Sequence, residues 1–148
     1  MLATDTRPSL TLERRFAAAP DAVFAAWTDP AKVSRWFGPE RVVRVEPEMD
    51  LRPGGRWRFA LWTSDGEQHA VGGVYREVVP GRRLVFTWAW QSTPERESLV
   101  TVEVKPDGAG TLLTLVHAQL FDDETRERHG HGWTGSLDKL ERLLATAA

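Results

Sequence analysis

A long series of short segments in which apolar and polar residues alternate constrains this chain most. Alternation sends every second side chain to the same face of a β-strand, so each such segment has one apolar and one polar face. Turn signals rich in Gly, Pro and Asp separate the segments, most clearly at 53–55, 64–66, 80–81 and 106–110. Because short turns join antiparallel neighbours, the chain predicts an antiparallel sheet with one buried face.

The alternation predicts seven strands. It is strongest in 42–51, where Val43, Val45, Met49 and Leu51 alternate with charged residues. The same two-residue period recurs with mainly aromatic residues in 55–62 and 83–91 and with Val and Leu in 97–105 and 111–119, and it is less regular in 68–79. The expected strands cover 9–17, 42–51, 55–62, 68–79, 83–91, 97–105 and 111–119.

Two short helices are expected after the first strand. The first runs from about Pro20 to Trp27, and its apolar residues recur at helical spacing. The second has Asp29 at the N-cap and Pro30 at the first helical position, a combination typical of helix starts. It ends at Gly38. Its apolar face comprises Val33, Trp36 and Phe37.

One long helix, roughly 122–146, closes the chain. Its apolar stripe consists of Trp133, Leu137, Leu140 and Leu144. One long helix and seven strands predict an α+β fold in which this stripe packs on the apolar face of the sheet. We expect a single domain over 9–146, a flexible N-terminus over 1–8, and a cavity where the curved sheet surrounds the helix.

Composition excludes several classes of protein. The 148 residues carry a formal net charge of −2 and no basic run, which argues against nucleic-acid binding. The apolar runs are too short and too often broken by charge for a membrane span, and residues 1–8 lack the order of a signal peptide. The chain has no cysteine, which excludes disulfides and thiolate chemistry and is typical of a cytoplasmic protein. Its seven tryptophans indicate a core, a pocket or an interface.

Several sequence blocks, taken in order, resemble one known family. They lie at 19–30, 36–39, 50–55, 73–80, 83–88, 110–117, 132–133 and 137–140. Together they are similar to bacterial relatives of the C-terminal domain of the activator of the 90-kDa heat-shock-protein ATPase, over residues from about 10 to 144. That family lies within the START, polyketide-cyclase and birch-pollen-allergen superfamily. The resemblance implies the helix-grip fold, a seven-stranded antiparallel sheet wrapped around a long C-terminal helix with two short helices after the first strand. It also implies a hydrophobic cavity between helix and sheet.

The strand alternation places most aromatic side chains on the concave face, where they would line a cavity for a flat apolar ligand. The alternative is a filled core without a cavity. Tyr75 either offers its hydroxyl to a ligand or packs in the sheet. The expected ligand-binding residues are Trp36, Phe37, Met49, Trp57, Phe59, Tyr75, Phe86, Trp88, Trp90, His117, Trp133 and Leu137.

Histidines supply the candidate reactive groups. His117 follows Leu113 and Leu115 on the inward face, so it either meets a ligand, as a hydrogen-bonding group or acid/base, or bonds to protein groups as a structural histidine. His129 and His131 would need an extended segment to bind a metal together with His117; otherwise they lie in the solvated start of the last helix. From the sequence we expect that the protein binds neither a metal ion nor a cofactor.

The sequence is compatible with three functions. The first is binding of a small apolar molecule, lipid-like or aromatic, in the cavity. The second is a protein-interaction module that contacts a chaperone or a regulator, for which the only sequence feature is Trp62 near the 64–66 turn; a homodimer is also left open. The third is an enzyme of the cyclase, dehydratase or hydrolase kind that uses His117. Because nucleophile-elbow, phosphate-loop, dinucleotide and HExxH motifs are absent, the sequence favours a non-enzyme.

Overall fold

The computed structural model describes residues 6–146 and contains the seven strands and three helices that the sequence predicts. The sequence predicts a flexible N-terminal segment over residues 1–8, and the first five of these lie outside the described residues. At the end of this segment, the Pro8 carbonyl accepts a hydrogen bond from the Leu120 N–H over 3.0 Å. In chain order the elements are β1 (Leu10–Phe16), α1 (Pro20–Thr28), α2 (Pro30–Val33), β2 (Val42–Met49), β3 (Arg56–Thr63), β4 (Gln68–Val79), β5 (Arg83–Trp90), β6 (Ser98–Asp107), β7 (Gly110–Ala118) and α3 (Asp123–Thr146).

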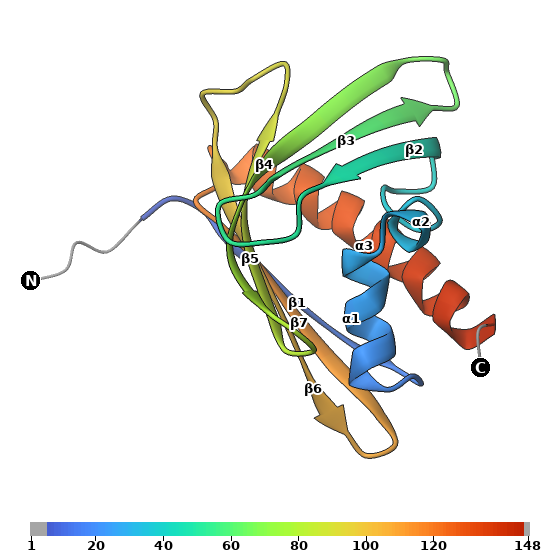
Figure 1. Cartoon of the computed structure of the whole chain (residues 1–148). Helices are drawn as coiled ribbons and strands as arrows, with labels where there is room; N and C mark the ends of the chain where they lie inside the picture. Colours follow the sequence, from blue (N-terminus) through green and yellow to red (C-terminus); the bar gives the residue numbers. More distant parts are fainter. Residues whose placement is uncertain (1–5, 147–148) are drawn as a thin grey trace, which may run out of the picture.

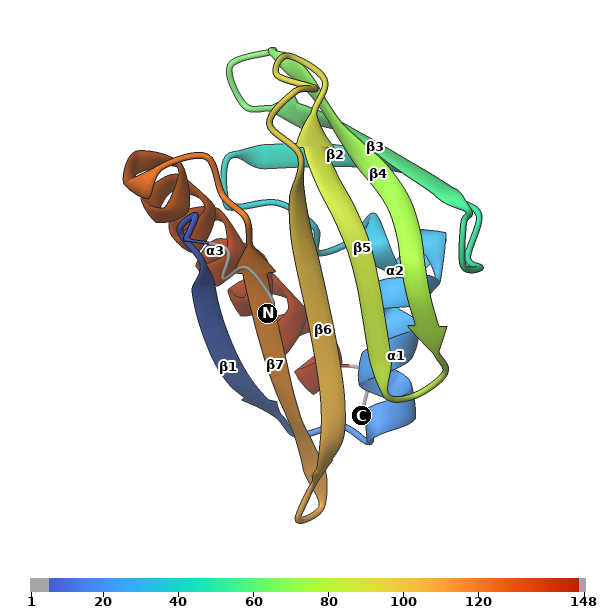
Figure 2. The same ribbon diagram turned by 90° about the vertical axis from the view of Figure 1, so that its left-hand side faces the viewer.

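The strands form one antiparallel sheet with the order β1-β7-β6-β5-β4-β3-β2. The first strand, β1, lies at one edge of the sheet and pairs with the last strand, β7 (Figure 2). Figure 1 shows the sheet curling so that β2 and β3 arch over the helices, with α1, α2 and α3 on the concave side. This arrangement confirms the predicted α+β architecture and its helix-grip form. No helix within residues 6–146 is both long and apolar enough to cross a membrane.

The pairing of β4 with β5 is irregular in the middle of β4, and its register shifts between Tyr75 and Glu77. A Cβ added to Gly73 would lie 2.1 Å from the Thr87 carbonyl oxygen, so only glycine permits this approach. Among the described residues, no register pair joins Gly73 or Val74 to β5; instead the Val74 N–H donates to the Thr87 hydroxyl oxygen over 2.8 Å. The Trp57 indole N–H donates to the Thr87 carbonyl over 3.1 Å. Thr87 therefore stabilises the irregular pairing by accepting from one backbone donor and one side-chain donor.

One strand prediction is wrong in detail. Val43 is 65% exposed, whereas Val42 and Val45 are buried. A β-bulge between Val42 and Arg44 inserts one residue, and one extra residue reverses which side chains face the core. Leu51, which was expected on the apolar face, follows the end of β2 and is exposed.

The short helices begin as predicted. The Asp29 carboxylate accepts from the Ala31 N–H over 3.0 Å and caps α2. The helix itself ends at Val33, earlier than predicted, and Trp36 and Phe37 are buried in the turns that follow. Gly38 adopts φ +91°, and a Cβ there would lie 2.8 Å from the Val42 side chain. The glycine thus turns the chain tightly into β2.

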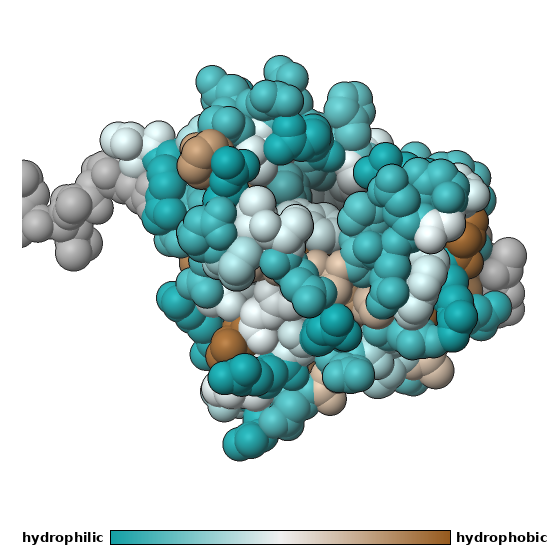
Figure 3. Space-filling view, turned by 90° about the horizontal axis from the view of Figure 1, so that it is seen from above, coloured by the Kyte–Doolittle hydropathy of each residue, from teal (hydrophilic) through white to brown (hydrophobic). Residues whose placement is uncertain are grey.

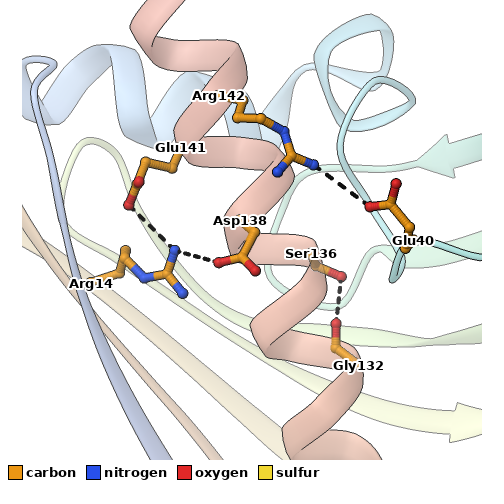
Figure 4. Close-up of polar contacts among 7 residues, drawn as sticks. All are labelled: Arg14, Glu40, Gly132, Ser136, Asp138, Glu141 and Arg142. Atoms are coloured by element: carbon orange, nitrogen blue, oxygen red, sulfur yellow. Dashed lines mark hydrogen bonds and ion pairs between the residues drawn. The ribbon is translucent and has the colours of Figure 1, made fainter.

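Polar contacts hold α3 from both sides (Figure 4). On one side Arg14 of β1 forms ion pairs with Asp138 and Glu141, at 2.9 and 3.3 Å. On the other side Arg142 lies 3.7 Å from Glu40 in the loop before β2. Next to it the Lys139 ammonium donates to two carbonyls of the same loop, those of Pro39 (2.9 Å) and Val42 (3.1 Å). These contacts fix the distance between α3 and the loop over 38–42.

We expect Thr87→Val to lower the free energy of unfolding by about 1 kcal/mol or more, because the isosteric change leaves the partly buried Val74 N–H without its acceptor. Urea denaturation measures this. Thr114→Val, on the outer face of β7, is the control and should change stability by less than about 0.5 kcal/mol. Equal effects of the two substitutions would contradict the role assigned to Thr87.

Candidate functional site

A cavity of about 260 Å³ lies between the first half of α3, the ends of β3 and β5, and the loop that leads into β2. Its buried wall is mostly apolar, and Phe37, Trp88 and Trp133 contribute three aromatic rings to it. Its exposed rim consists of Arg41, His69, Ser92 and Arg128. The view from above shows polar side chains ringing this end of the molecule, with less polar surface between them (Figure 3). The remaining lining residues are Gly38, Pro39, Val42, Leu61, Thr63, Trp90, His129, Gly132 and Ser136.

The predicted aromatic set divides between this pocket and a filled core. Phe37, Trp88, Trp90 and Trp133 line the pocket. The other rings pack edge to face, as Trp57 does on Phe59 with centroids 4.9 Å apart, and leave a void of only about 20 Å³. The residues of that filled half are Trp36, Trp57, Phe59, Tyr75 and Phe86.

Three other predicted residues lie away from the pocket. Met49 lines another, more open pocket of about 720 Å³ on β2, β3, β4 and β5, where charged and polar residues such as Arg56 and Gln91 also contribute. Leu137 is buried in the core cluster and is not among the residues that line the pocket. His117 is fully buried and is likewise not a lining residue. Burial also raises the pKa of the Tyr75 hydroxyl, which stays protonated in the core.

His117 is the centre of a hydrogen-bond chain that crosses the core. The Trp133 indole N–H donates to its Nδ1 over 3.0 Å, and its Nε2 lies 2.7 Å from the Ser98 hydroxyl oxygen. An indole N–H can only donate, so Nδ1 accepts and the ring proton is on Nε2. The Ser98 hydroxyl in turn donates to the Trp88 carbonyl over 3.2 Å. Both ring nitrogens therefore have protein partners, the arrangement of a structural histidine.

His129 repeats this arrangement closer to the surface, with the opposite tautomer. Its Nδ1 lies 2.8 Å from the Thr125 carbonyl, which can only accept, so the proton is on Nδ1. Its Nε2 accepts from the Trp90 indole N–H over 3.1 Å. The expectation of a solvated helix start holds for the exposed His131 but is wrong for His129, which is half-buried. No group of three or more potential metal ligands occurs within residues 6–146.

Both histidines are held in the neutral form. Burial lowers the pKa of His117 well below 6.5, and the neighbouring His129 lowers it further. Burial also lowers the pKa of His129, helped by the charge of Arg128 and opposed by the hydrogen bond to Thr125. The two rings lie 5.0 Å apart, so one positive charge there disfavours a second. The pocket wall beside them is therefore uncharged near neutral pH.

A buried donor in the pocket wall lacks a partner. The Trp88 indole N–H is inaccessible to solvent and has no acceptor among the described residues. Buried polar groups normally form hydrogen bonds, and leaving one unpaired costs about 1–3 kcal/mol. Trp88 also lines a second cavity of about 210 Å³, which shares Trp90 and His129 with the first. Trp88 therefore combines a ring that borders both cavities with a buried donor that has no partner among the described residues.

Several residues that line the pocket were not predicted from the sequence. Leu61 and Thr63 continue the inward period of Phe59, and the same period would have found them. Gly132 and Ser136 flank Trp133 on α3, at positions one residue before and three after it. Arg41 comes from a loop, and no sequence signal places it at the pocket.

Trp62, the feature behind the interaction hypothesis, lies outside this site. It is on the outward side of β3, where the Arg44 guanidinium lies 4.6 Å from its ring centroid. The ring is thus half-buried beneath a charged side chain.

A curled seven-stranded sheet that grips a long C-terminal helix defines the helix-grip class, the fold of the ligand-binding domains of the START superfamily. The model of the family "Activator of Hsp90 ATPase homolog 1-like protein" matches residues 17–145, and the chain belongs to this family. Comparison with curated proteins gave no match.

Solved structures of bacterial proteins share the whole fold. The AHSA1 protein of Silicibacter pomeroyi is 38% identical over 95% of this chain and 100% of its own, with a TM-score of 0.82. CalU16 of Micromonospora echinospora is 31% identical over 92% of this chain and 75% of its own, with a TM-score of 0.71. A protein of Chromobacterium violaceum is 28% identical over 93% and 97%, with a TM-score of 0.80.

The two neutral histidines predict a pH-dependent stability. Because their folded-state pKa values lie below 6.5, the unfolded chain binds more protons than the folded chain as the pH falls below that value. Their contribution is therefore complete above about pH 6.5 and is lost on acidification. We expect His129→Gln, which keeps a donor and an acceptor, to reduce the loss of unfolding free energy between pH 7.5 and 5.5 by up to about 1.4 kcal/mol per pH unit.

Urea denaturation at several pH values measures this slope. The exposed His131→Gln is the matched control and should leave the slope unchanged. If His129→Gln has the same slope as the parent chain, His129 is not held neutral by its surroundings.

Proposed function

We propose that this protein binds a small, largely apolar molecule of one or two aromatic rings in the cavity between α3 and the ends of β3 and β5. One observation carries the proposal: a pocket lined by the rings of Phe37, Trp88 and Trp133 remains open at this end of the core. The family is one of ligand-binding domains, which agrees with this proposal.

The size of the pocket limits the ligand. Sites for drug-sized molecules commonly occupy about 300–1,000 Å³, so a volume of about 260 Å³ is at the small end of the range. A long lipid chain does not fit in it. A flat ring would contact the rings of Trp88 and Trp133, whose centroids are 5.1 Å apart.

The same residues favour binding over catalysis, because the histidines that line the pocket, His69 and His129, each already bond to protein groups. No Asp or Glu is among the residues that line the pocket, and His117 has both nitrogens occupied by Trp133 and Ser98. General acid–base chemistry needs a group within hydrogen-bond reach of the substrate. His117 is in our account a positioning residue that holds Trp133 in the pocket wall.

Gly132 provides a direct test, because it lines the pocket and a Cβ added there meets no atom within 4 Å. We expect Gly132→Leu to fill the pocket and abolish binding of neutral aromatic probes such as indole, 2-naphthol and biphenyl. Leucine is also a better helix former than glycine, by about 0.8 kcal/mol, so the variant should stay folded. Calorimetry and quenching of tryptophan fluorescence measure the binding.

Gly130→Leu is the matched control, since Gly130 lies on the same helix and does not line the pocket. It should bind the probes as the parent chain does. The proposal fails if the parent chain binds none of the probes, or if the two leucine variants lose affinity equally.

A further inference from the structure

We propose that the ligand is an anion, an aromatic carboxylate whose ring enters the pocket while its carboxylate lies at the rim between Arg41 and Arg128. This inference rests on the proposed function and specifies the chemical class of the ligand. It is carried by the charges of the rim, by how those charges are paired, and by the neutrality of the wall behind them.

The charges that line the pocket have one sign. Arg41 and Arg128 are lining residues, with the histidines His69 and His129 beside them, and no Asp or Glu lines the pocket. The chain as a whole has 21 acidic and 19 basic residues, so a mixed lining would be the ordinary outcome. A concave site lined by charges of one sign favours a ligand of the opposite sign.

Arg128 can leave its present partner at small cost. Its guanidinium lies 2.9 Å from the Glu124 carboxylate one helical turn away, and the two side chains are 58% and 78% exposed. Its other contact is a long hydrogen bond of 3.4 Å to the Thr125 hydroxyl. Such exposed pairs contribute only about 0.3–0.5 kcal/mol. A hydrogen bond from arginine to a ligand carboxylate beside an apolar wall is stronger, because water competes less there.

Arg41 has no ion-pair partner within the described part of the chain. Its backbone is fixed, because the Ser64 N–H donates to its carbonyl over 2.8 Å. The charge of Arg41 contributes to lowering the pKa of Asp65, but that carboxylate accepts its hydrogen bonds from the Thr63 hydroxyl and the Glu67 N–H. The guanidinium of Arg41 is therefore available to a ligand.

The wall behind the rim suits the apolar part of such a ligand. His129 is neutral and hydrogen-bonded to Trp90, so it adds no charge inside the pocket. Leu61, Trp88 and Trp133 supply the apolar contact. An aromatic carboxylate matches this division, with a planar apolar body and a charged end that arginine binds through two parallel hydrogen bonds.

The test compares 2-naphthoate with 2-naphthamide, which have nearly the same shape and differ in charge. We expect calorimetry at low salt to show about tenfold tighter binding of 2-naphthoate, a difference of about 1.4 kcal/mol. The preference should shrink as sodium chloride is raised, because salt screens exposed charges. Arg128→Gln and Arg41→Gln should each lower the affinity for 2-naphthoate about tenfold and affect 2-naphthamide less.

Arg126→Gln is the control, because Arg126 lies on the same helix, pairs with Asp123 and does not line the pocket. If 2-naphthamide binds as tightly as 2-naphthoate, or the rim variants weaken both equally, the anion inference is overturned while the proposed function stands. If neither probe binds the parent chain, the proposed function fails and this inference fails with it.

Discussion

The hydrogen bond from the Trp133 indole to His117 ties the long helix to the sheet, and the pocket depends on it. It joins α3 to β7, and through Ser98 and the Trp88 carbonyl it continues to β6 and β5. Each donor in this chain has one acceptor, so only one tautomer of His117 satisfies all of them. A fully satisfied buried network specifies one packing arrangement more sharply than apolar contacts do. The register of α3 on the sheet follows from it.

That register decides which residues form the pocket. With Trp133 held against the sheet, Gly132 and Ser136 face the space beneath the ends of β3 and β5. The Ser136 hydroxyl donates back to the Gly132 carbonyl over 2.9 Å, so it offers only acceptor capacity to a ligand (Figure 4). Lys139 holds the opposite wall in place through the carbonyls of Pro39 and Val42. The pocket thus lies between α3 and the segment that leads into β2, and polar contacts fix the distance between these two elements.

The fold was largely predictable from the sequence, because a two-residue period and a helical stripe survive small irregularities. The bulge that exposes Val43 was not, since one inserted residue leaves no mark in composition. The site was predictable only in part. Alternation shows that Trp57 and Trp88 face inward, but it does not show that Trp57 packs edge to face in a filled core whereas Trp88 borders a cavity. Arg128 looks like one charge of a solvated helix face until the fold brings it to the rim.

The central claim is that a ligand enters the pocket and contacts Trp88, and the indole N–H signals of the seven tryptophans test it most directly. Residue-specific assignment of these signals in ¹H–¹⁵N spectra allows a titration with 2-naphthol to be followed at each ring. We predict a large shift of the Trp88 signal, because its ring borders the pocket and its N–H has no partner to hold its environment constant, and a smaller shift of the Trp133 signal, whose N–H stays bonded to His117. A titration that shifts only the outward-facing Trp62, or none of the seven, would contradict the account.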